Sequence, residues 1–285
     1  MDYIDLNGEL VKNQSGQDKL LAFLYTNMAG RVLLKPLVMP WVSVLGGRLL
    51  SGKLSTIPIK RFIQKNHIDM SDYENRNYQS FNDFFTRKII PEKRPVNNQA
   101  LMVSPSDGKV TVYPIQKDLS LKIKNTSYHL SELLKNEKLT QCFEGGYAYI
   151  VRLSVDDYHR YIYPVSGSKT KNYHINGVFH TVNPVANDFY PIYKENTREY
   201  TILHTKNNGN VLMMEVGALM VGKITNHHEK RVVMRGEEKG YFEFGGSTIV
   251  VLTEKKMGEP RQDLLWNTGD GYETKILQGQ ALTER

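Results

Sequence analysis

Near the end of the chain, the stretch Gly245-Gly-Ser-Thr248 leads directly into the apolar run Ile249-Val-Val-Leu252. Glycine pairs are typical of turns and β-branched aliphatic runs are typical of strands, so this stretch predicts a turn followed by a strand. The same residues allow a second interpretation. A serine that follows glycine can attack the carbonyl in front of it, because glycine has no Cβ to obstruct the strained turn that the attack requires.

Composition is that of a globular protein. The 285 residues are enough for one large domain or two modest ones, and 40% hydrophobic residues are enough for a substantial core. The single cysteine, Cys142, excludes an intramolecular disulfide and a cysteine-rich metal site, and we expect its thiol to be buried. The acidic start of the chain is unlike a secretory signal, so we expect a cytoplasmic location.

Positive charge is concentrated in one segment. The net charge is +7, and residues 19–65 contain no Asp or Glu but eight basic residues: Lys19, Arg31, Lys35, Arg48, Lys53, Lys60, Arg61 and Lys65. Apolar runs with Phe23 and Trp41 lie between these cations. The longest uncharged run of the segment, Pro36–Gly47, has twelve residues, whereas roughly 18 to 20 apolar residues are needed to span a bilayer.

This pattern favours peripheral binding to an anionic membrane on its cytoplasmic side. Each Lys or Arg near an anionic surface contributes about 1 kcal/mol to binding, and aromatic side chains suit the headgroup region. The alternative is that these residues form core helices whose basic ends are solvated. A nucleic-acid partner is not expected, because basic patches that grip phosphates are usually polar between the charges.

Helix signals dominate the first part of the chain. Residues 1–75 are predicted to be helical, with breaks at Pro36, Pro40, Gly46-Gly47, Gly52 and Pro58. A better defined helix begins at Ser80, which forms a capping-box pattern with Asp83. The three phenylalanines that follow, at positions 81, 84 and 85, share one helical face and are predicted to belong to the core.

From Leu101 onward the pattern changes to short strands separated by turns. One helix, about Leu130–Leu139, interrupts strands predicted at 109–113, 147–153, 200–204, 211–216, 222–224 and 248–252. We therefore predict an α+β fold in which a helical N-terminal segment lies on a mostly antiparallel β core. Two parts follow from this division: a membrane-associating segment, residues 1–75, and a β-rich catalytic domain, residues 76–285.

Five blocks, in this order and spacing, resemble phosphatidylserine decarboxylase of the bacterial, pyruvoyl-dependent kind. The resemblance runs from about Phe62 to the C-terminus. No single block is decisive, but five in register are hard to obtain by chance. The blocks are Ser80-Phe-Asn-Asp-Phe-Phe-Thr-Arg-Lys88, Ser104-Pro-Ser-Asp-Gly-Lys-Val110, Asp157-Tyr-His-Arg160, Glu215-Val-Gly-Ala-Leu-Met-Val-Gly222 and Gly236-Glu-Glu-Lys-Gly-Tyr-Phe-Glu-Phe-Gly-Gly-Ser-Thr248.

The resemblance implies a cofactor made from the chain itself. Decarboxylation of an amino acid requires an electron sink conjugated to the substrate nitrogen, and in this family a pyruvoyl group supplies it. Ser247 would attack the Gly246 carbonyl, and elimination and hydrolysis would leave pyruvoyl at position 247. The products would be a β chain of residues 1–246 and an α chain of residues 247–285. The reaction would then convert phosphatidylserine to phosphatidylethanolamine.

The family also implies an Asp and a His that activate the serine. Asp107 matches the family aspartate, although Asp-Gly is also a common hairpin turn. Many members carry a second histidine where this chain has Ile162, which cannot accept a proton. His159 matches the first family histidine, which is linked to decarboxylation, and we expect it to serve the cleavage as well. His180 is the second candidate for that base.

Other residues have weaker assignments. Thr248 fits the family role of supporting Ser247, and Arg198 lies in a block that resembles one near the substrate headgroup, where its planar fork would suit a carboxylate or phosphate. The alternative for Arg198 is a surface ion pair with Glu195 or Glu199. The run from His227 to Glu229 does not predict a metal site, because adjacent strand residues point to opposite faces.

Two rival functions remain open from the sequence. The first is a lipid-binding pseudoenzyme of the same fold that never cleaves itself, because the usual second histidine is missing. The second is a serine hydrolase that uses Ser247, which is disfavoured because the G-x-S-x-G elbow is absent. Acyl-chain preference and oligomeric state, a homodimer included, are also left open.

Overall fold

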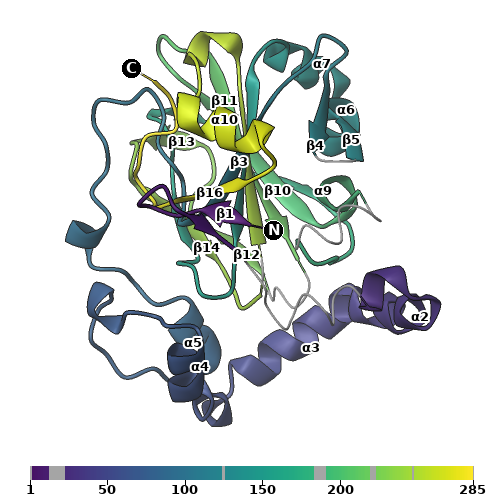
Figure 1. The fold of residues 1–285 in the computed structure, drawn as a ribbon, viewed down its shortest axis with the longest axis vertical. Helices are drawn as coiled ribbons and strands as arrows, with labels where there is room; N and C mark the ends of the chain where they lie inside the picture. Colours follow the sequence, from purple (N-terminus) through teal and green to yellow (C-terminus); the bar gives the residue numbers. More distant parts are fainter. Residues whose placement is uncertain are drawn as a thin grey trace.

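The computed structural model describes residues 2–12, 23–123, 126–182, 191–218, 223–245 and 247–284. Its central sheet contains β1 (Tyr3–Ile4), β2 (Leu10–Val11), β3 (Gly108–Pro114), β6 (Tyr147–Leu153), β8 (Gly167–Lys169), β9 (Tyr173–Ile175), β10 (Arg198–His204), β11 (Asn210–Gly217), β13 (Arg231–Val233), β15 (Ser247–Thr253) and β16 (Glu273–Ile276). Within the described residues the strand order is β13-β8-β10-β11-β15-β6-β3-β16-β1-β2, and β9 also pairs with β10. The pairings are antiparallel except for β1 with β16. The predicted α+β class is confirmed (Figure 1).

Strand β15 lies in the middle of this sheet. It pairs along its whole length with β11 on one side and β6 on the other, and all of its residues are buried. Ile249 and Val251 enter the hydrophobic core on one face, whereas Val250 and Leu252 enter the core on the opposite face. A strand that is covered on both faces requires apolar residues at every position, which explains the uninterrupted run after Thr248.

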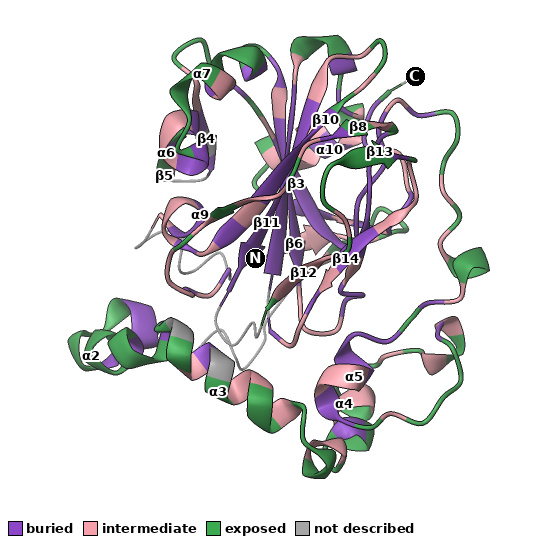
Figure 2. Cartoon of the chain, turned by 180° about the vertical axis from the view of Figure 1, so that it is seen from behind, coloured by how far each residue is buried: buried purple, intermediate pink, exposed green. Residues whose placement is uncertain are grey.

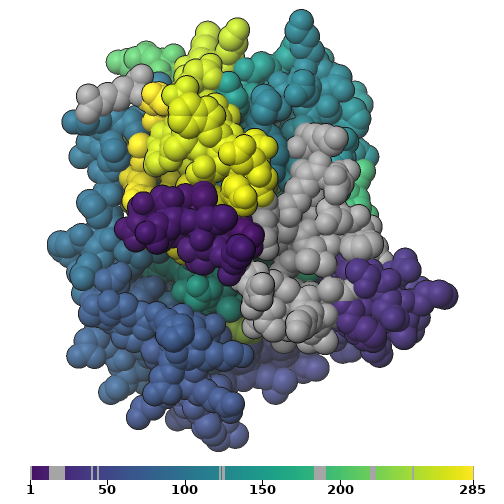
Figure 3. Space-filling view, viewed as in Figure 1, coloured from purple at the N-terminus to yellow at the C-terminus, as the bar shows by residue number. Residues whose placement is uncertain are grey.

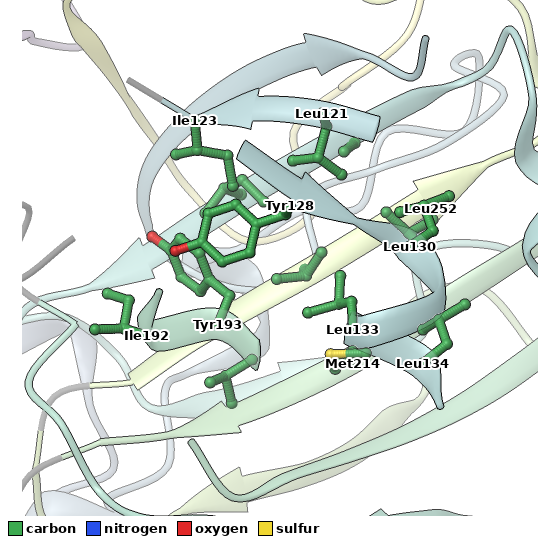
Figure 4. Close-up of a cluster of buried hydrophobic side chains, with 14 of the residues drawn as sticks. Leu121, Ile123, Tyr128, Leu130, Leu133, Leu134, Ile192, Tyr193, Met214 and Leu252 are labelled. Carbon is green, nitrogen blue, oxygen red and sulfur yellow. The ribbon is translucent and has the colours of Figure 1, made fainter. Parts of the chain in front are cut away.

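Each face of the sheet carries its own covering layer. A second sheet of β12 (Ile224–Asn226), β14 (Glu238–Phe242) and β7 (Arg160–Ile162) covers the face of Ile249. The hairpin β4 (Ser120–Ile123) and β5 (Thr126–His129), with helices α6 (Leu130–Leu134) and α9 (Ile192–Glu195), covers the other face. Figure 4 shows Tyr128, Leu133 and Tyr193 of this layer packed over Met214 and Leu252.

Short helices complete the β-rich part: α7 (Glu137–Thr140), η4 (Gln141–Phe143), η5 (Lys255–Met257) and α10 (Gln262–Gly269). The helix predicted at Leu130–Leu139 is divided into α6 and α7, because Lys135 between them is left-handed with a φ of 52°. Cys142 was predicted to be buried, and this is wrong: it is exposed, because Phe143 takes the buried position of η4.

Helices dominate residues 28–72, within the segment 1–75 that was predicted to be helical, and continue to residue 93. They are α2 (Met28–Leu37), α3 (Pro40–Leu50), η1 (Lys53–Thr56), α4 (Ile59–Lys65), η2 (Met70–Asp72), α5 (Phe81–Phe85) and η3 (Pro91–Lys93). In Figure 1, α2 and α3 extend along one side of the β-rich part. Breaks at Pro40, Gly52 and Pro58 are confirmed, since each residue lies at the start of a helix.

Two predicted breaks are wrong. Pro36 lies inside α2, one residue before its end, where it removes only one helical hydrogen bond. Gly46 and Gly47 lie inside α3, because a glycine in a helix interior costs only about 1 kcal/mol and does not end the helix.

The first residues were also predicted to be helical, and this too is wrong. β1 and β2 form a hairpin whose turn is held by Asp5, which accepts hydrogen bonds from the amides of Asn7 at 2.9 Å and Glu9 at 2.8 Å. Gly8 in this turn has a φ of 84°, which favours glycine. The hairpin adds β1 to β16, and Figure 3 shows it, in dark purple, lying against the yellow C-terminal part of the chain.

Helix α5 begins as the sequence predicts. The Ser80 hydroxyl accepts a hydrogen bond from the amide of Asp83 at 3.1 Å, and the Asp83 carboxylate accepts one from the amide of Gln79 at 2.9 Å. Phe81, Phe84 and Phe85 are all buried, as expected for core residues. This short helix is therefore fixed at its start by capping and along its face by aromatic packing.

Candidate active site

Ser247 is the first residue of β15, opposite Gly217 of β11 and Leu153 of β6. Its side chain is fully buried, and within the described ranges its Oγ has no hydrogen-bond partner. Leaving a buried hydroxyl unpaired costs about 1 to 3 kcal/mol, and such groups often have a chemical role. Gly245 has a φ of 140°, which favours glycine. Gly246, on the other side of the expected cleavage bond, lies outside the described residues.

His159 is buried close to this turn. Its Nδ1 lies 2.9 Å from the carbonyl oxygen of Asp157, so Nδ1 carries the proton and donates it. Nε2 then has a free lone pair, and no described residue hydrogen-bonds to it. Burial lowers the pKa of His159 to about 4, against smaller opposing effects from Asp157 and the main chain of Gly245. The imidazole is therefore neutral at pH 7 and able to accept a proton at Nε2.

An aromatic cluster surrounds His159 and the turn before Ser247. The ring centroid of Phe85 lies 4.1 Å from that of His159 and 5.0 Å from that of Phe244. The amide of Phe244 donates to the side-chain oxygen of Asn82 at 3.0 Å. Helix α5 thus holds both the imidazole and the segment that leads into β15. Sequence reasoning placed these phenylalanines in the core but missed this role, because nothing local links α5 to Phe244.

Asp107 is buried in the loop before β3. Its carboxylate accepts hydrogen bonds from Arg94 at 2.7 and 2.9 Å and from the amide of Gln278 at 2.8 Å. Burial acts to lower the pKa of Arg94, but hydrogen bonding to Asp107 and its charge outweigh this and raise it. In the described part of the chain, no hydrogen bond joins Asp107 to His159 or Ser247. The expected Asp-His-Ser relay is therefore not assembled, and Asp107 stays a prediction as a catalytic residue.

Ile162 lies in a small apolar cluster with Ala100 and Val103. Its amide donates to the carbonyl oxygen of Pro105 at 2.9 Å, which places it next to the loop of Asp107. A histidine here would be close to that carboxylate. Isoleucine supplies apolar contacts at this position but no proton acceptor.

His180 lies between the N-terminal segment and the sheet. Its Nδ1 is 3.2 Å from the Tyr25 hydroxyl, and its Nε2 is 3.5 Å from a carboxylate oxygen of Glu195. Burial lowers the pKa of His180 to about 4. The side chain of Asn196 donates at 2.8 Å to the carbonyl groups of both His180 and Gly217, so this loop reaches the residue opposite Ser247. Both ring nitrogens of His180 have a polar neighbour, whereas Nε2 of His159 has no hydrogen-bond partner among the described residues.

Thr248 is buried, and its Oγ1 has no hydrogen-bond partner among the residues that the structure describes. Successive side chains on a strand point to opposite faces, so Thr248 faces away from the side of Ser247. Support of Ser247 by the Thr248 hydroxyl stays a prediction.

Arg198 is almost fully buried at the start of β10. Its guanidinium donates at 2.8 to 3.1 Å to four main-chain carbonyl groups, those of Glu132, Leu133, Lys194 and Asn196. The alternative of a surface ion pair is therefore wrong, because burial turns the donors toward carbonyl groups. A headgroup anion would have to displace these hydrogen bonds, so this geometry gives no support to the predicted substrate contact.

The histidine pair at 227 and 228 is engaged in hydrogen bonds. His227 Nε2 lies 2.6 Å from a carboxylate oxygen of Glu238, and His228 Nδ1 lies 3.4 Å from the Tyr163 hydroxyl. Across the described ranges, no group of three or more His, Cys, Asp and Glu side chains is arranged to hold a metal ion.

A family model described as phosphatidylserine decarboxylase matches residues 81–283, which include α5, Asp107, His159 and Ser247. The chain belongs to the phosphatidylserine decarboxylase family. The phosphatidylserine decarboxylase proenzyme 2 of Clostridium acetobutylicum is 46% identical over 266 residues, covering 93% of this chain and 91% of that protein. Similar proenzymes are those of Ruminiclostridium cellulolyticum, 40% identical over 271 residues (93% and 90% covered), and Clostridium botulinum, 39% identical over 242 residues (83% and 82% covered).

Membership in the phosphatidylserine decarboxylase family confirms the resemblance found in the five sequence blocks, and with it the predicted enzyme class, a carboxy-lyase. The serine hydrolase alternative is therefore wrong. The match covers the β-rich part and α5, and the relatives extend it over most of the N-terminal segment.

Burial of His159 predicts acid sensitivity. Its pKa is about 4 in the folded protein, against about 6.5 unfolded, so its contribution to stability is complete above pH 6.5 and is lost as the pH falls toward 4. Between pH 7 and pH 5 we expect this residue to remove about 2 kcal/mol from the free energy of unfolding. Urea unfolding at both pH values measures this change. The two chains to compare are Ser247→Ala, which stays uncut, and Ser247→Ala/His159→Phe. An equal pH dependence in the two chains would contradict the assignment.

Proposed function

We propose that this phosphatidylserine decarboxylase is a proenzyme that cleaves itself between Gly246 and Ser247 and then converts phosphatidylserine to phosphatidylethanolamine. The observation that carries the proposal is the buried Ser247 hydroxyl at the start of β15, which has no partner in the described part of the chain. Gly245, two residues earlier, has a positive φ of 140°. The imidazole of His159 lies near this turn, and its Nε2 has no hydrogen-bond partner among the described residues.

Self-cleavage and formation of the pyruvoyl group use only atoms of this chain and one water molecule. Ser247 Oγ bonds to the carbonyl carbon of Gly246 while the peptide bond between the two residues breaks, which gives an ester and a free amine. Loss of the Ser247 Cα proton then expels Gly246 as a carboxylate and leaves dehydroalanine. Water converts dehydroalanine to a pyruvoyl group and ammonia. Apolar surroundings slow competing attack by water on the ester until this point.

The residues around position 247 fit a pyruvoyl group. The group would arise in place from the Ser247 side chain, which is buried and already lacks a hydrogen-bond partner within the described ranges. Pyruvoyl supplies an electron sink for the electron pair left when carbon dioxide departs. Phe85 and Phe244 form an apolar wall that disfavours the charged substrate carboxylate relative to uncharged carbon dioxide. In this proposal, His159 Nε2 holds a proton and returns it to the substrate α-carbon.

Membrane binding is proposed for the N-terminal apolar face, the exposed apolar side chains of residues 23–57. They are Phe23, Met28, Val32, Leu33, Leu37, Met39, Trp41, Leu45, Leu49, Leu54 and Ile57. Figure 2 shows how much of α2 and α3 is exposed, in green. The alternative of core helices holds only in part. Leu34 of α2 enters the core of the β-rich part, and Ile59 of α4 is buried against α5, but a core helix would also bury the exposed residues of this face.

Basic residues accompany the N-terminal apolar face. Seven of the eight cations are described, and all seven are exposed: Arg31, Lys35, Arg48, Lys53, Lys60, Arg61 and Lys65. The eighth, Lys19, lies outside the described residues. In the described part no single helix is long and apolar enough to cross a bilayer, whereas α2 and α3 together pass this test as a pair bent by 67°. We propose that the face lies in the headgroup region of an anionic membrane.

Cleavage at Ser247 is the first test. The wild-type chain should give fragments of residues 1–246 and 247–285 on a denaturing gel, with intact masses that show pyruvoyl at position 247. Ser247→Ala should leave one chain, because no hydroxyl is present to form the ester. Ser43→Ala is the control, since Ser43 is another buried serine without a described partner and should not affect cleavage. An uncut wild-type chain, folded and with lipid present, would support the pseudoenzyme.

The histidines are separated by single variants. His159→Ala should leave an uncut chain, because its free Nε2 serves proton transfer at Ser247, whereas His180→Ala should still be cut. The reverse result would assign the role to His180. Cleavage in the double variant, with loss of cleavage in Asp107→Asn, would exclude both histidines and leave Asp107.

The N-terminal apolar face is tested by sedimentation with anionic vesicles. Leu49→Glu/Leu54→Glu should bind less than the wild-type chain, because it adds two negative charges to the face and removes two apolar contacts. Val232→Glu/Met234→Glu makes the same kind of change to exposed residues of the β-rich part and should bind normally. High salt should weaken wild-type binding, since exposed charges are screened over roughly 8 to 10 Å. Equal binding by the two variants would reject this surface.

A further inference from the structure

A buried ion pair near Ser247 has no part in the function proposed above. Lys239 Nζ lies 2.8 Å from Glu215 Oε2, and both side chains are fully buried. Asn226 links to both: its oxygen accepts from Lys239 at 2.5 Å and its amide donates to Glu215 Oε2 at 3.2 Å. Taking both charges out of water is expensive, and apolar residues of similar size are often at least as stable at such a place. Stability alone therefore does not explain the pair.

A bulge in β14 directs Lys239 toward this position. Glu238 pairs with Ile162 of β7 and Gly240 pairs with Tyr161, so Lys239 is an extra residue without an opposite partner. Bulges of this kind redirect a side chain and are frequent next to active sites. Here the bulge sends the lysine from the smaller sheet into the space between the two sheets, where it reaches β11.

Glu215 and Ser247 lie on the same face of the central sheet. Glu215 is opposite Ile249 and Gly217 is opposite Ser247, so the glutamate and the serine are diagonal neighbours on adjacent strands. Diagonal neighbours of this kind are about 7 to 8 Å apart, with somewhat less between their Cβ atoms, which is within reach of a long side chain. Lys239 and Asn226 occupy Oε2 of the glutamate, whereas its Oε1 is buried and has no partner among the described residues. Ser247 Oγ is likewise buried and has no hydrogen-bond partner among the described residues.

We propose that Glu215 accepts the Ser247 hydroxyl proton in the first step of self-cleavage, and that Lys239 is the positioning residue that holds its carboxylate. The O–H bond of Ser247 breaks and the proton passes to Glu215 Oε1 as Oγ bonds to the Gly246 carbonyl carbon. The same proton then passes to the departing amine of residue 247. His159 removes the Cα proton in the second step. This inference rests on the proposed self-cleavage and supplies the base that Ile162 cannot provide.

The electrostatic surroundings suit this role. Burial raises the pKa of Glu215, and the charge and hydrogen bond of Lys239 oppose that rise. A carboxylate with a raised pKa is a stronger base than an ordinary one, and the charge and hydrogen bond of Lys239 favour its ionised form. The other charged or titratable groups that interact with Glu215 are Glu199, Lys169, Tyr161 and Tyr163. Among these, Glu199 also acts to raise the pKa of Glu215.

The main test uses a neutral pair of nearly the same shape, Glu215→Gln/Lys239→Met. Replacing both charges leaves none unpaired, so we expect a folded chain with unchanged near-ultraviolet circular dichroism. Self-cleavage should be slower by about 100-fold or more, the usual loss when a general base is removed. Glu132→Gln/Lys194→Met is the matched control, since it neutralises another Lys–Glu pair, 2.8 Å apart, on α6 and α9. A double variant at 215 and 239 that cleaves at the wild-type rate overturns the proposal.

Hydroxylamine separates the two steps, because at neutral pH it cuts an ester but leaves ordinary peptide bonds intact. Any cutting at the Asn-Gly bonds 7–8, 176–177 and 208–209 gives fragments of other masses. His159→Ala should accumulate the ester and be cut by hydroxylamine at position 246. Glu215→Gln/Lys239→Met should form no ester and resist hydroxylamine. If the double variant is uncut alone but is cut by hydroxylamine, Glu215 does not act in the first step and the proposal fails. A wild-type chain that is never cut, with or without hydroxylamine, would instead refute the proposed self-cleavage itself.

The pH dependence of Lys239→Met gives an independent readout. Loss of the lysine charge should raise the pKa of Glu215, so the pH of half-maximal cleavage should move upward and raised pH should restore the rate. A merely structural defect would lower the rate equally at every pH. An unmoved profile in folded Lys239→Met overturns the proposal, and if this variant does not fold, the double variant decides.

Discussion

The central constraint in this molecule is that a polar residue must begin a strand that is buried on both faces. Ser247 enters the sheet between β11 and β6, where water does not reach it and no described group satisfies its hydroxyl. The free-energy cost of burying this unpaired hydroxyl is offset by the two hydrophobic cores that pack on either face of β15. Two surrounding features act near this serine. Helix α5 fixes the turn before the strand, and the second sheet brings Lys239 to Glu215.

Signals that lie close together in the sequence predicted much of the fold. The strands around β15, the change from helices to strands near Leu101 and the start of α5 each depend on neighbouring residues or on a simple period. Ser247 and His159 were identifiable because they belong to short blocks with family resemblance. The exposed, basic character of the N-terminal helices could be predicted from a run of cations without nearby acidic residues, since that property requires no knowledge of tertiary contacts.

Features that depend on distant residues could not be predicted. Lys239 and Glu215 are 24 positions apart and meet only because a bulge shifts one strand, which no periodic pattern shows. Arg198 looked like a ligand for anions, but its donors are used by main-chain carbonyl groups brought in by other segments. The same holds for Arg94, since no local sequence pattern indicates that it binds the Asp107 carboxylate. Each case turns on which groups tertiary packing places within hydrogen-bond reach.

The position of β15 and β16 has a consequence for the matured protein. Breaking the bond before Ser247 would leave the 39-residue fragment 247–285 with one strand between β11 and β6 and another between β3 and β1. The small piece would thus be interleaved with the large one at two places in the same sheet. Separation would require opening four strand pairings and exposing both cores. The cleaved protein would accordingly behave as a complex of two fragments joined by backbone hydrogen bonds. The two fragments would still unfold together in one cooperative transition.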